Sequence, residues 1–221
     1  GINGFIELLR ASYLDEEQFY LVEHIDSAIS KLRNLVDDIL YFANTSSGKI
    51  EIDCQDVDLE SHLCRVLRAH EYLAKQKGLE FRLTWRTAAF TQARIDVSHL
   101  LQVLSNILNN AVKFTEKGAI SCDVLFEKQT LKIEISDTGA GMTAQQLAHT
   151  FTPFEQADNS TERRYGGTGL GLTLAKQLIE AMKGEINISS TFGKGTNVFI
   201  SVPLTKVAKP DLAASSVYWS V

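Results

Sequence analysis

Three polar residues have the types and the spacing to hold a metal ion and a phosphate chain. Asn106, Asn110 and Lys113 are separated by four and three residues, so they lie on one face of the amphipathic helix predicted over residues 97–114. Two amide oxygens and an ammonium group suit hydrated Mg²⁺ and a triphosphate, because Mg²⁺ prefers oxygen ligands and keeps several waters. A solvated polar helix face is the alternative interpretation of this triplet.

A carboxylate follows a predicted apolar strand, in the sequence Asp-Thr-Gly-Ala-Gly that runs from Asp137 to Gly141. A carboxylate there can accept a hydrogen bond from an exocyclic amine such as that of adenine, while the glycines leave room for a ring. One buried charge-assisted bond of this kind is worth about 1.5–3 kcal/mol, which is enough to select adenine over guanine. The alternative is an Asp-Thr-Gly turn that binds nothing.

A glycine-rich turn, residues 166–172, leads into the helix predicted over residues 173–182. Glycine adopts positive φ and lets backbone N–H groups approach a ligand, so such a turn can bind phosphate at a helix start. It is not a dinucleotide fingerprint, because charged residues at 161–164 replace the preceding strand. Residues 193–196 are not a P-loop, because Ile188 occupies the position of its first glycine. A flexible loop that caps a helix remains the alternative.

Two aromatic residues, Phe151 and Phe154, stand where a long polar segment over residues 154–168 begins. They are predicted to be core anchors that fix the start of a mobile lid. A tight hairpin at 193–196 carries Thr196, whose hydroxyl could reach a base. Each of these features also occurs without a ligand, whereas the whole set in this order indicates a nucleotide site.

The composition limits the kind of protein. The 221 residues carry a net charge of −5, which argues against general binding to nucleic acid. No apolar run approaches the roughly 20 residues of a membrane span, so no direct membrane contact is expected here. The cysteines are odd in number and widely spaced, which suits a reducing cytoplasm and neither disulfides nor zinc. They are Cys54, Cys64 and Cys122.

Residues 1–45 are predicted to form a helical hairpin. The first helix shows no capping signal, which suggests that it begins upstream, whereas Asp15 and Gln18 form a capping box for the second. The second helix carries an a/d seam of apolar residues at alternating spacings of three and four. Two helices cannot enclose this seam, so we expect a homodimeric four-helix bundle; packing of the hairpin on its own domain is the alternative. The seam residues are Val22, Ile25, Ile29, Leu32, Val36, Ile39 and Ala43.

After a linker expected at residues 44–48, residues 49–204 are predicted to form a two-layer α/β sandwich, with a mixed sheet on one side and three main helices on the other. The fold class is therefore α+β, and residues 205–221 are predicted to be a tail or linker. Strands are expected at 49–52, 79–85, 120–126, 131–135, 185–191 and 197–203, and a loop at 87–93. Helices are expected from a cap at Asp58 to 76, over 97–114 closed by Lys117-Gly118, and over 143–150 and 173–182.

These motifs resemble the N, G1, F and G2 boxes of sensor histidine kinases, in the same order and at the same separations. The resemblance extends from Gly1 to Leu204 and is greatest for hybrid sensor kinases of bacterial two-component systems. It implies the Bergerat ATP-binding fold, with Mg²⁺-ATP between the helix of Asn106 and a lid over residues 155–167. The matching sequences are Asn106-x-x-x-Asn110-Ala111-x-Lys113-Phe114-Thr115, Asp137-x-Gly139-x-Gly141, Phe151-x-Pro153-Phe154 and Gly167-Thr168-Gly169-Leu170-Gly171-Leu172.

The resemblance also implies roles for single residues. Asn110 would bind Mg²⁺, and Asn106, Lys113 and Arg163 would be catalytic, with Arg163 facing the γ-phosphate. A core position for Phe114 and a solvated charge for Arg163 are the alternatives. Ala140 and Glu162 depart from the family pattern. The implied ATP-binding residues are Asn106, Asn110, Lys113, Phe114, Asp137, Gly139, Gly141, Phe154, Gly167, Thr168, Gly169, Leu170, Gly171, Leu172 and Thr196.

The family's phosphoacceptor histidine would lie a little over two helical turns upstream of Gly1, so this chain alone is not expected to autophosphorylate. In the intact protein, the resemblance implies transfer of the γ-phosphoryl of ATP to that histidine, then to an aspartate of a response-regulator receiver domain. It also implies a cytoplasmic catalytic region and an anchor in the inner membrane. None of the histidines present lies in a phosphoacceptor motif; they are His24, His62, His70, His99 and His149.

Two other functions remain open. One is a non-enzymatic dimeric scaffold or pseudokinase that modulates another kinase. The other is an ATP-hydrolysing clamp of the same superfamily, like gyrase or the heat-shock chaperones. Those enzymes have a glutamate as general base where this chain has Asn106, so water activation would lack its base.

Overall fold

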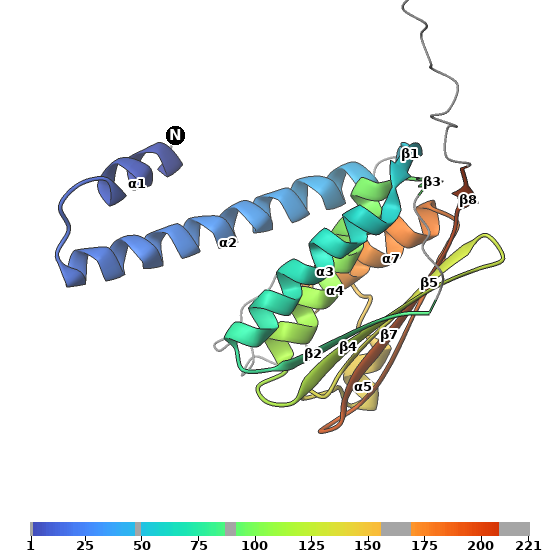
Figure 1. Cartoon of the computed structure of the whole chain (residues 1–221). Coiled ribbons are helices and arrows are strands. Elements are labelled where there is room, and N and C mark those ends of the chain that lie inside the picture. Colours follow the sequence, from blue (N-terminus) through green and yellow to red (C-terminus); the bar gives the residue numbers. More distant parts are fainter. Residues whose placement is uncertain (1, 47–49, 87–91, 156–168, 208–221) are drawn as a thin grey trace, which may run out of the picture. The chain divides into compact units, whose positions relative to one another are not determined.

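The computed structural model describes residues 2–46, 50–86, 92–155 and 169–207 (Figure 1). The chain divides into two compact units, Gly1–Lys49 and Ile50–Val221. None of the helices within the described ranges is long and apolar enough to cross a membrane.

The first unit is a helical hairpin, with α1 over Ile2–Arg10 and α2 over Glu16–Ser46. The predicted capping box is confirmed, because the backbone N–H of Gln18 donates to Asp15 Oδ1 (2.8 Å) and that of Asp15 donates to Gln18 Oε1 (3.1 Å). Arg10 joins the two helices through Glu23 (2.7 Å) and Asp26 (2.9 Å). The linker prediction was wrong for residues 44–46, which still belong to α2.

The apolar seam of α2 is covered by α1 only near its start. Val22 is buried, whereas Ile25, Leu32, Val36 and Ile39 are 43–59% exposed within this unit. Helix α1 covers 9 residues here and α2 covers 31, so at a rise of about 1.5 Å per residue, residues 2–10 can lie beside only about a third of α2.

The second unit is built on a five-stranded mixed sheet, as the sequence predicts. The strand order is β2-β4-β5-β7-β6, with β2 parallel to β4 and every other neighbouring pair antiparallel. The tight turn between β4 and β5 lies at Lys128 and Gln129 as predicted, and both residues have positive φ. The strands are Glu80–Trp85 (β2), Ala119–Glu127 (β4), Thr130–Asp137 (β5), Glu185–Thr191 (β6) and Gly195–Pro203 (β7).

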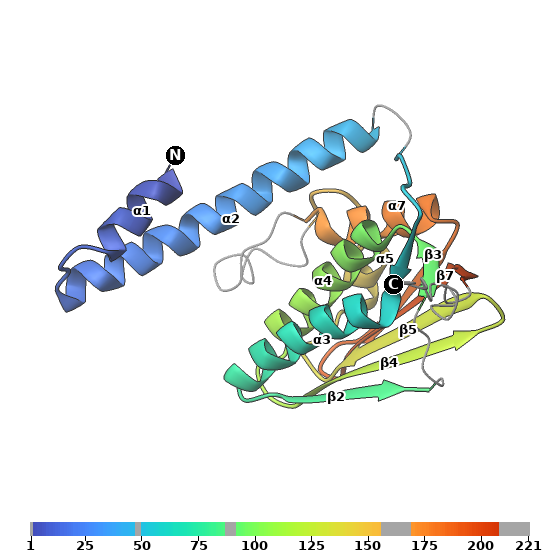
Figure 2. The ribbon, with the colours of Figure 1, turned by 45° about the horizontal axis from the view of Figure 1, so that its top comes forward.

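Three helices cover one face of this sheet and make the predicted second layer (Figures 1 and 2). The core lies between the layers, where strand residues such as Ile133, Ile135 and Ile200 and helix residues such as Leu104 and Leu178 are buried. The side chain of Asp58 caps the helix that begins at Leu59, and the side chain of Asp96 caps the helix that begins at Val97. The helices are Leu59–Gln76 (α3), Val97–Phe114 (α4) and Gly171–Ala181 (α7), and the short α5 covers Ala144–Ala148.

A second, three-stranded sheet was not predicted. Its order is β1-β3-β8, all antiparallel. The prediction of a strand at 49–52 was wrong for residues 50–52, which form neither helix nor strand. Residues 92 and 93, expected in a loop, belong to β3, and residues 205 and 206, expected in the tail, form β8. The strands are Gln55–Asp58 (β1), Gln92–Ile95 (β3) and Thr205–Lys206 (β8).

Several predicted boundaries also shift. Helix α4 ends at Phe114 as predicted, but the residue that closes it is Thr115, whose backbone is extended, and not Lys117-Gly118. Helix α7 begins at Gly171 rather than at Thr173, and β7 begins at Gly195 rather than at Asn197. Both shifts extend an element into glycines, which a sequence pattern assigns to turns.

Candidate functional site

Asp137 ends strand β5 with one carboxylate oxygen held by the backbone. Its Oδ1 accepts hydrogen bonds from the N–H groups of Gly139 (2.8 Å) and Thr196 (3.3 Å). Burial raises the pKa of the Asp137 carboxyl, and the two backbone bonds offset part of this rise. No described residue donates to Oδ2, so that oxygen can accept a hydrogen bond from a ligand.

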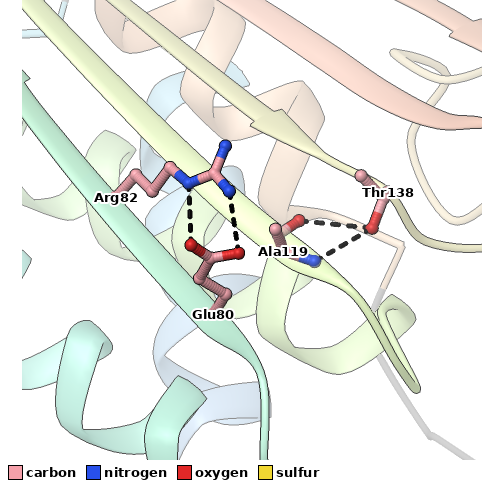
Figure 3. Close-up of polar contacts among 4 residues, drawn as sticks. All are labelled: Glu80, Arg82, Ala119 and Thr138. Carbon is pink, nitrogen blue, oxygen red and sulfur yellow. Dashed lines mark hydrogen bonds and ion pairs between the residues drawn. The ribbon is translucent and has the colours of Figure 1, made fainter.

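The residue after Asp137 fixes the loop to the neighbouring strand. Thr138 Oγ1 accepts from the N–H of Ala119 (3.0 Å) and contacts its carbonyl oxygen (3.4 Å; Figure 3). The backbone N–H of Thr138 donates to the same carbonyl (3.1 Å). At the same end of the sheet, Arg82 donates to both carboxylate oxygens of Glu80 (2.8 and 2.9 Å; Figure 3). This exposed ion pair places charge on an edge strand, which discourages pairing with other chains.

Gly139 and Gly141 are required by close backbone contacts. A Cβ at Gly139 would lie 2.5 Å from the carbonyl oxygen of Phe114, and the next N–H, of Ala140, donates to that oxygen (3.1 Å). Gly141 has φ of 62°, and a Cβ there would lie 2.1 Å from the carbonyl of Thr191. These contacts draw the loop against the end of α4 and against β6.

The polar stripe of α4 meets the start of α7. Asn106 Nδ2 donates to the carbonyl of Gly171 (3.3 Å), which leaves the Asn106 amide oxygen for another contact. Asn106, Asn110 and Lys113 are all half-buried on α4. Burial lowers the pKa of Lys113, whose ammonium lies 4.7 Å from the ring centre of the half-buried Phe114. A negatively charged ligand would stabilise the charged ammonium of Lys113 and so offset the free-energy cost of burying it.

The residues that flank the predicted lid come together. A Cβ at Gly169 would lie 3.0 Å from the carbonyl oxygen of Glu155 and from the backbone of Phe154. Thr173 Oγ1 donates to the carbonyl of Phe151 (3.0 Å) and ties α7 to the same segment. The core-anchor prediction was wrong for Phe154, which is 60% exposed with φ of 63°. Of the predicted site, Arg163, Gly167 and Thr168 lie outside the described residues.

The sequence reasoning missed Ser190 on β6. Its Oγ accepts from the N–H of Met142 (2.8 Å) and lies 2.9 Å from the carbonyl oxygen of Gly195 and 3.0 Å from Thr196 Oγ1. A signal was present, because the alternation of Ile186, Ile188 and Ser190 puts this hydroxyl on the buried face of β6.

The described contacts join the predicted residues into two groups, which α4 connects. One group contains Asp137, its glycines and Thr196, and it reaches α4 at Phe114. The other contains the turn at Gly169–Gly171 and reaches α4 at Asn106. Asn110 lies one helical turn from each of these α4 positions. Leu170, in the second group, is 1% exposed, and Leu172 is half-buried in α7.

Residues 95–206 match the family of histidine kinase-, DNA gyrase B- and HSP90-like ATPases. The chain belongs to this family. Two relatives are the autoinducer 2 sensor kinase/phosphatase LuxQ of Vibrio cholerae (36% identical over 215 residues, 96% of this chain and 25% of LuxQ) and the sensor histidine kinase GacS of Pseudomonas protegens (37% over 212 residues, 93% of this chain and 23% of GacS). The crystal structure of full-length ShkA in complex with AMPPNP is 30% identical, with a TM-score of 0.77 over 94% of this chain and 43% of ShkA.

The chain spans about a quarter of the length of these two relatives. Their similarity extends over nearly the whole chain, including residues before the ATPase match. The sequence prediction of an ATP-binding catalytic region of a sensor histidine kinase is confirmed, and so is its α/β sandwich.

Proposed function

We propose that this region binds Mg²⁺-ATP with the adenine amine at Asp137 and, in the intact protein, transfers the γ-phosphoryl to a histidine. The observation that carries the proposal is the asymmetric carboxylate of Asp137. Two backbone N–H groups hold Oδ1, so Oδ2 is a pre-oriented acceptor at the end of a strand. Such an acceptor suits an exocyclic amine, and the binding of AMPPNP by ShkA supports an adenine nucleotide.

The triphosphate is proposed to extend along α4 toward the first turn of α7. Asn106 and Lys113 would contact phosphate oxygens, and Asn110 would supply an amide oxygen to Mg²⁺. This donor set fits Mg²⁺, which neutralises phosphate charge when bound and is held by few protein ligands. Helix α7 adds the positive end of its dipole, since its first residue, Gly171, already touches Asn106. Arg163 is proposed to face the γ-phosphate.

Phosphoryl transfer is favoured over hydrolysis by the side chain at position 106. An amide cannot take a proton from water, and Asn106 already donates to Gly171. The protein would therefore contribute positioning and charge neutralisation, which are the main requirements of phosphoryl transfer.

The partners of the intact protein are also part of the proposal. The a/d seam of α2 supports a homodimer through the hairpin, because two helices cannot enclose it and a second copy would bury residues such as Ile25, Leu32, Val36 and Ile39. Onward transfer to a receiver-domain aspartate, and an anchor in the inner membrane, are proposed from the relatives, whose names describe sensor kinases.

Calorimetry with the 221-residue chain tests the nucleotide assignment. ATP with Mg²⁺ should bind, and incubation with γ-labelled ATP should leave no acid-labile phosphate on this chain, because its histidines are not proposed acceptors. Absence of ATP binding would overturn the site. Label on any histidine present, or steady hydrolysis of ATP, would overturn the proposed reaction.

A further inference from the structure

Three polar side chains form a row across adjacent strands beside the proposed adenine site. Asp137 of β5 pairs directly with Thr196 of β7, which pairs directly with Ser190 of β6. Residues opposite one another in an antiparallel pair have side chains on the same face, with Cβ atoms about 4.5–5.5 Å apart. The face is the helix-covered one, since Ile135, two residues before Asp137, and Val198, two residues after Thr196, are buried. Ser190 therefore belongs to the site and not to the surface.

The hydrogen bonds of Ser190 bear on which acceptors the hydroxyl groups of Ser190 and Thr196 donate to. Ser190 Oγ accepts from the Met142 N–H (2.8 Å). Ser190 Oγ lies 2.9 Å from the Gly195 carbonyl oxygen, which can only accept, so Ser190 can donate its single hydrogen there. When Ser190 donates to Gly195, the remaining contact, 3.0 Å to Thr196 Oγ1, has Thr196 as its donor. In that arrangement the Thr196 hydrogen is used within the row, and the Thr196 oxygen can only accept from a ligand.

We propose that Ser190 is a positioning residue that makes the Thr196 hydroxyl an acceptor and thereby selects 6-aminopurine over 6-oxopurine nucleotides. The inference rests on the proposed function, because it assumes that the base lies at Asp137. Two neighbouring acceptors, Asp137 Oδ2 and Thr196 Oγ1, match an amine that has two hydrogens to donate. A 6-oxopurine presents a carbonyl oxygen at the same position, so acceptor faces acceptor and the wrong base is rejected.

The substitution Ser190→Ala tests the proposal. It frees the Thr196 hydrogen to turn toward the ligand, where it can donate to the oxygen of a 6-oxopurine. The preference for ATP over inosine triphosphate, measured as the ratio of the two dissociation constants, should fall about 3- to 10-fold, the range of one neutral hydrogen bond. A purely structural role would weaken both nucleotides equally and leave the ratio unchanged.

Matched variants make the test specific. Ser189→Ala removes a hydroxyl from the exposed opposite face of β6 and should leave the ratio unchanged, while Ser190→Thr keeps the hydroxyl and should preserve it. In a Thr196→Val background, Ser190→Ala should no longer change the ratio, because the group through which it acts is gone.

The outcomes separate this inference from the proposed function. If the unmodified chain binds no ATP, the proposed function fails. Suppose that the unmodified chain prefers ATP. The role of Ser190 alone is overturned if Ser190→Ala leaves the ratio of dissociation constants unchanged, or if it changes that ratio by the same factor with and without Thr196→Val. If Ser190→Ala does not fold, Thr196→Val alone decides: it should lower the affinity for ATP and leave the affinity for inosine triphosphate unchanged or higher, because it removes an acceptor that faces the inosine oxygen. A loss of affinity for inosine triphosphate, or an unchanged affinity for ATP, overturns the inference.

Discussion

Replacing Asp137 by asparagine would reverse the hydrogen bonding of the proposed adenine site with little change in shape. The amide oxygen can keep the bonds to the N–H groups of Gly139 and Thr196, so the amide nitrogen must take the position of Oδ2. A donor then faces the donating amine of adenine. The loss of one charge-assisted bond is worth about 1.5–3 kcal/mol. At 1.4 kcal/mol per tenfold, the affinity for ATP should fall about 10- to 150-fold.

Calorimetric titration with Mg²⁺-ATP measures this loss. Glu134→Gln is a matched control, because Glu134 is an exposed carboxylate on the same strand and accepts a hydrogen bond from Asn197 Nδ2 (2.6 Å). The Glu134→Gln variant should bind ATP with unchanged affinity. Inosine triphosphate should bind Asp137→Asn no worse than the unmodified chain, since its carbonyl can accept from the new amide. An unchanged affinity of Asp137→Asn for ATP would show that the base binds elsewhere.

The same substitution should not cost stability. Burial raises the pKa of Asp137, so the folded state holds this proton more tightly than the unfolded state does. The resulting stabilisation is present at low pH and is lost as pH rises from the unfolded pKa through the raised folded pKa. At neutral pH the buried charge is therefore a net cost, and the neutral amide of Asp137→Asn should raise the thermal unfolding midpoint without nucleotide. A fall in that midpoint would show that the bonds at Oδ1 outweigh the burial.

Three further predictions concern the pH, the glycine turn and the hairpin. The affinity for ATP should weaken as pH falls through the raised pKa of Asp137, because the protonated carboxyl no longer offers two acceptor oxygens; calorimetry across a pH series should show no such weakening for Asp137→Asn. Gly169→Ala combined with Gly171→Ala should abolish measurable ATP binding and leave the oligomeric state intact, since Gly169 has φ of 69° and Gly171 meets Asn106; unchanged affinity would place the phosphates elsewhere. Leu32→Glu with Val36→Glu should convert the proposed dimer to a monomer in analytical ultracentrifugation while ATP binding persists, and a dimer that survives both charges would exclude the α2 seam as the interface.

Long periodic elements were predictable because their signals are local. The apolar period of α4 gave its bounds, residues 97–114, and the alternation in β4 and β5 gave both strands and the turn between them. The side-chain caps at Asp58 and Asp15 were readable for the same reason, since a capping carboxylate and the N–H that donates to it lie three residues apart.

Features that depend on distant contacts were not predictable. The sheet β1-β3-β8 consists of strands of two to four residues, too short for an alternation to be recognised, and each is defined by a partner far along the chain. Phe154 has an apolar side chain, but only the fold shows that it is exposed. Ser190 carries a polar side chain at a core-facing position, and the register of three strands is needed to place it beside Asp137.

The fixed end of α4 affects how binding of the base and binding of the phosphates of a nucleotide depend on one another. The Phe114 carbonyl accepts from Ala140, and Lys77 donates to the carbonyls of Val112 and Lys113 (2.6 and 2.9 Å), so the last turn of this helix is held by the rest of the domain. From there a straight rod of about 12 Å leads back to Asn106 at the glycine turn. In the proposed complex, base and phosphates are therefore two linked ligands on one rigid support. Once the base is bound, the phosphates arrive at a high effective concentration, so ATP should bind far more tightly than adenosine or triphosphate alone.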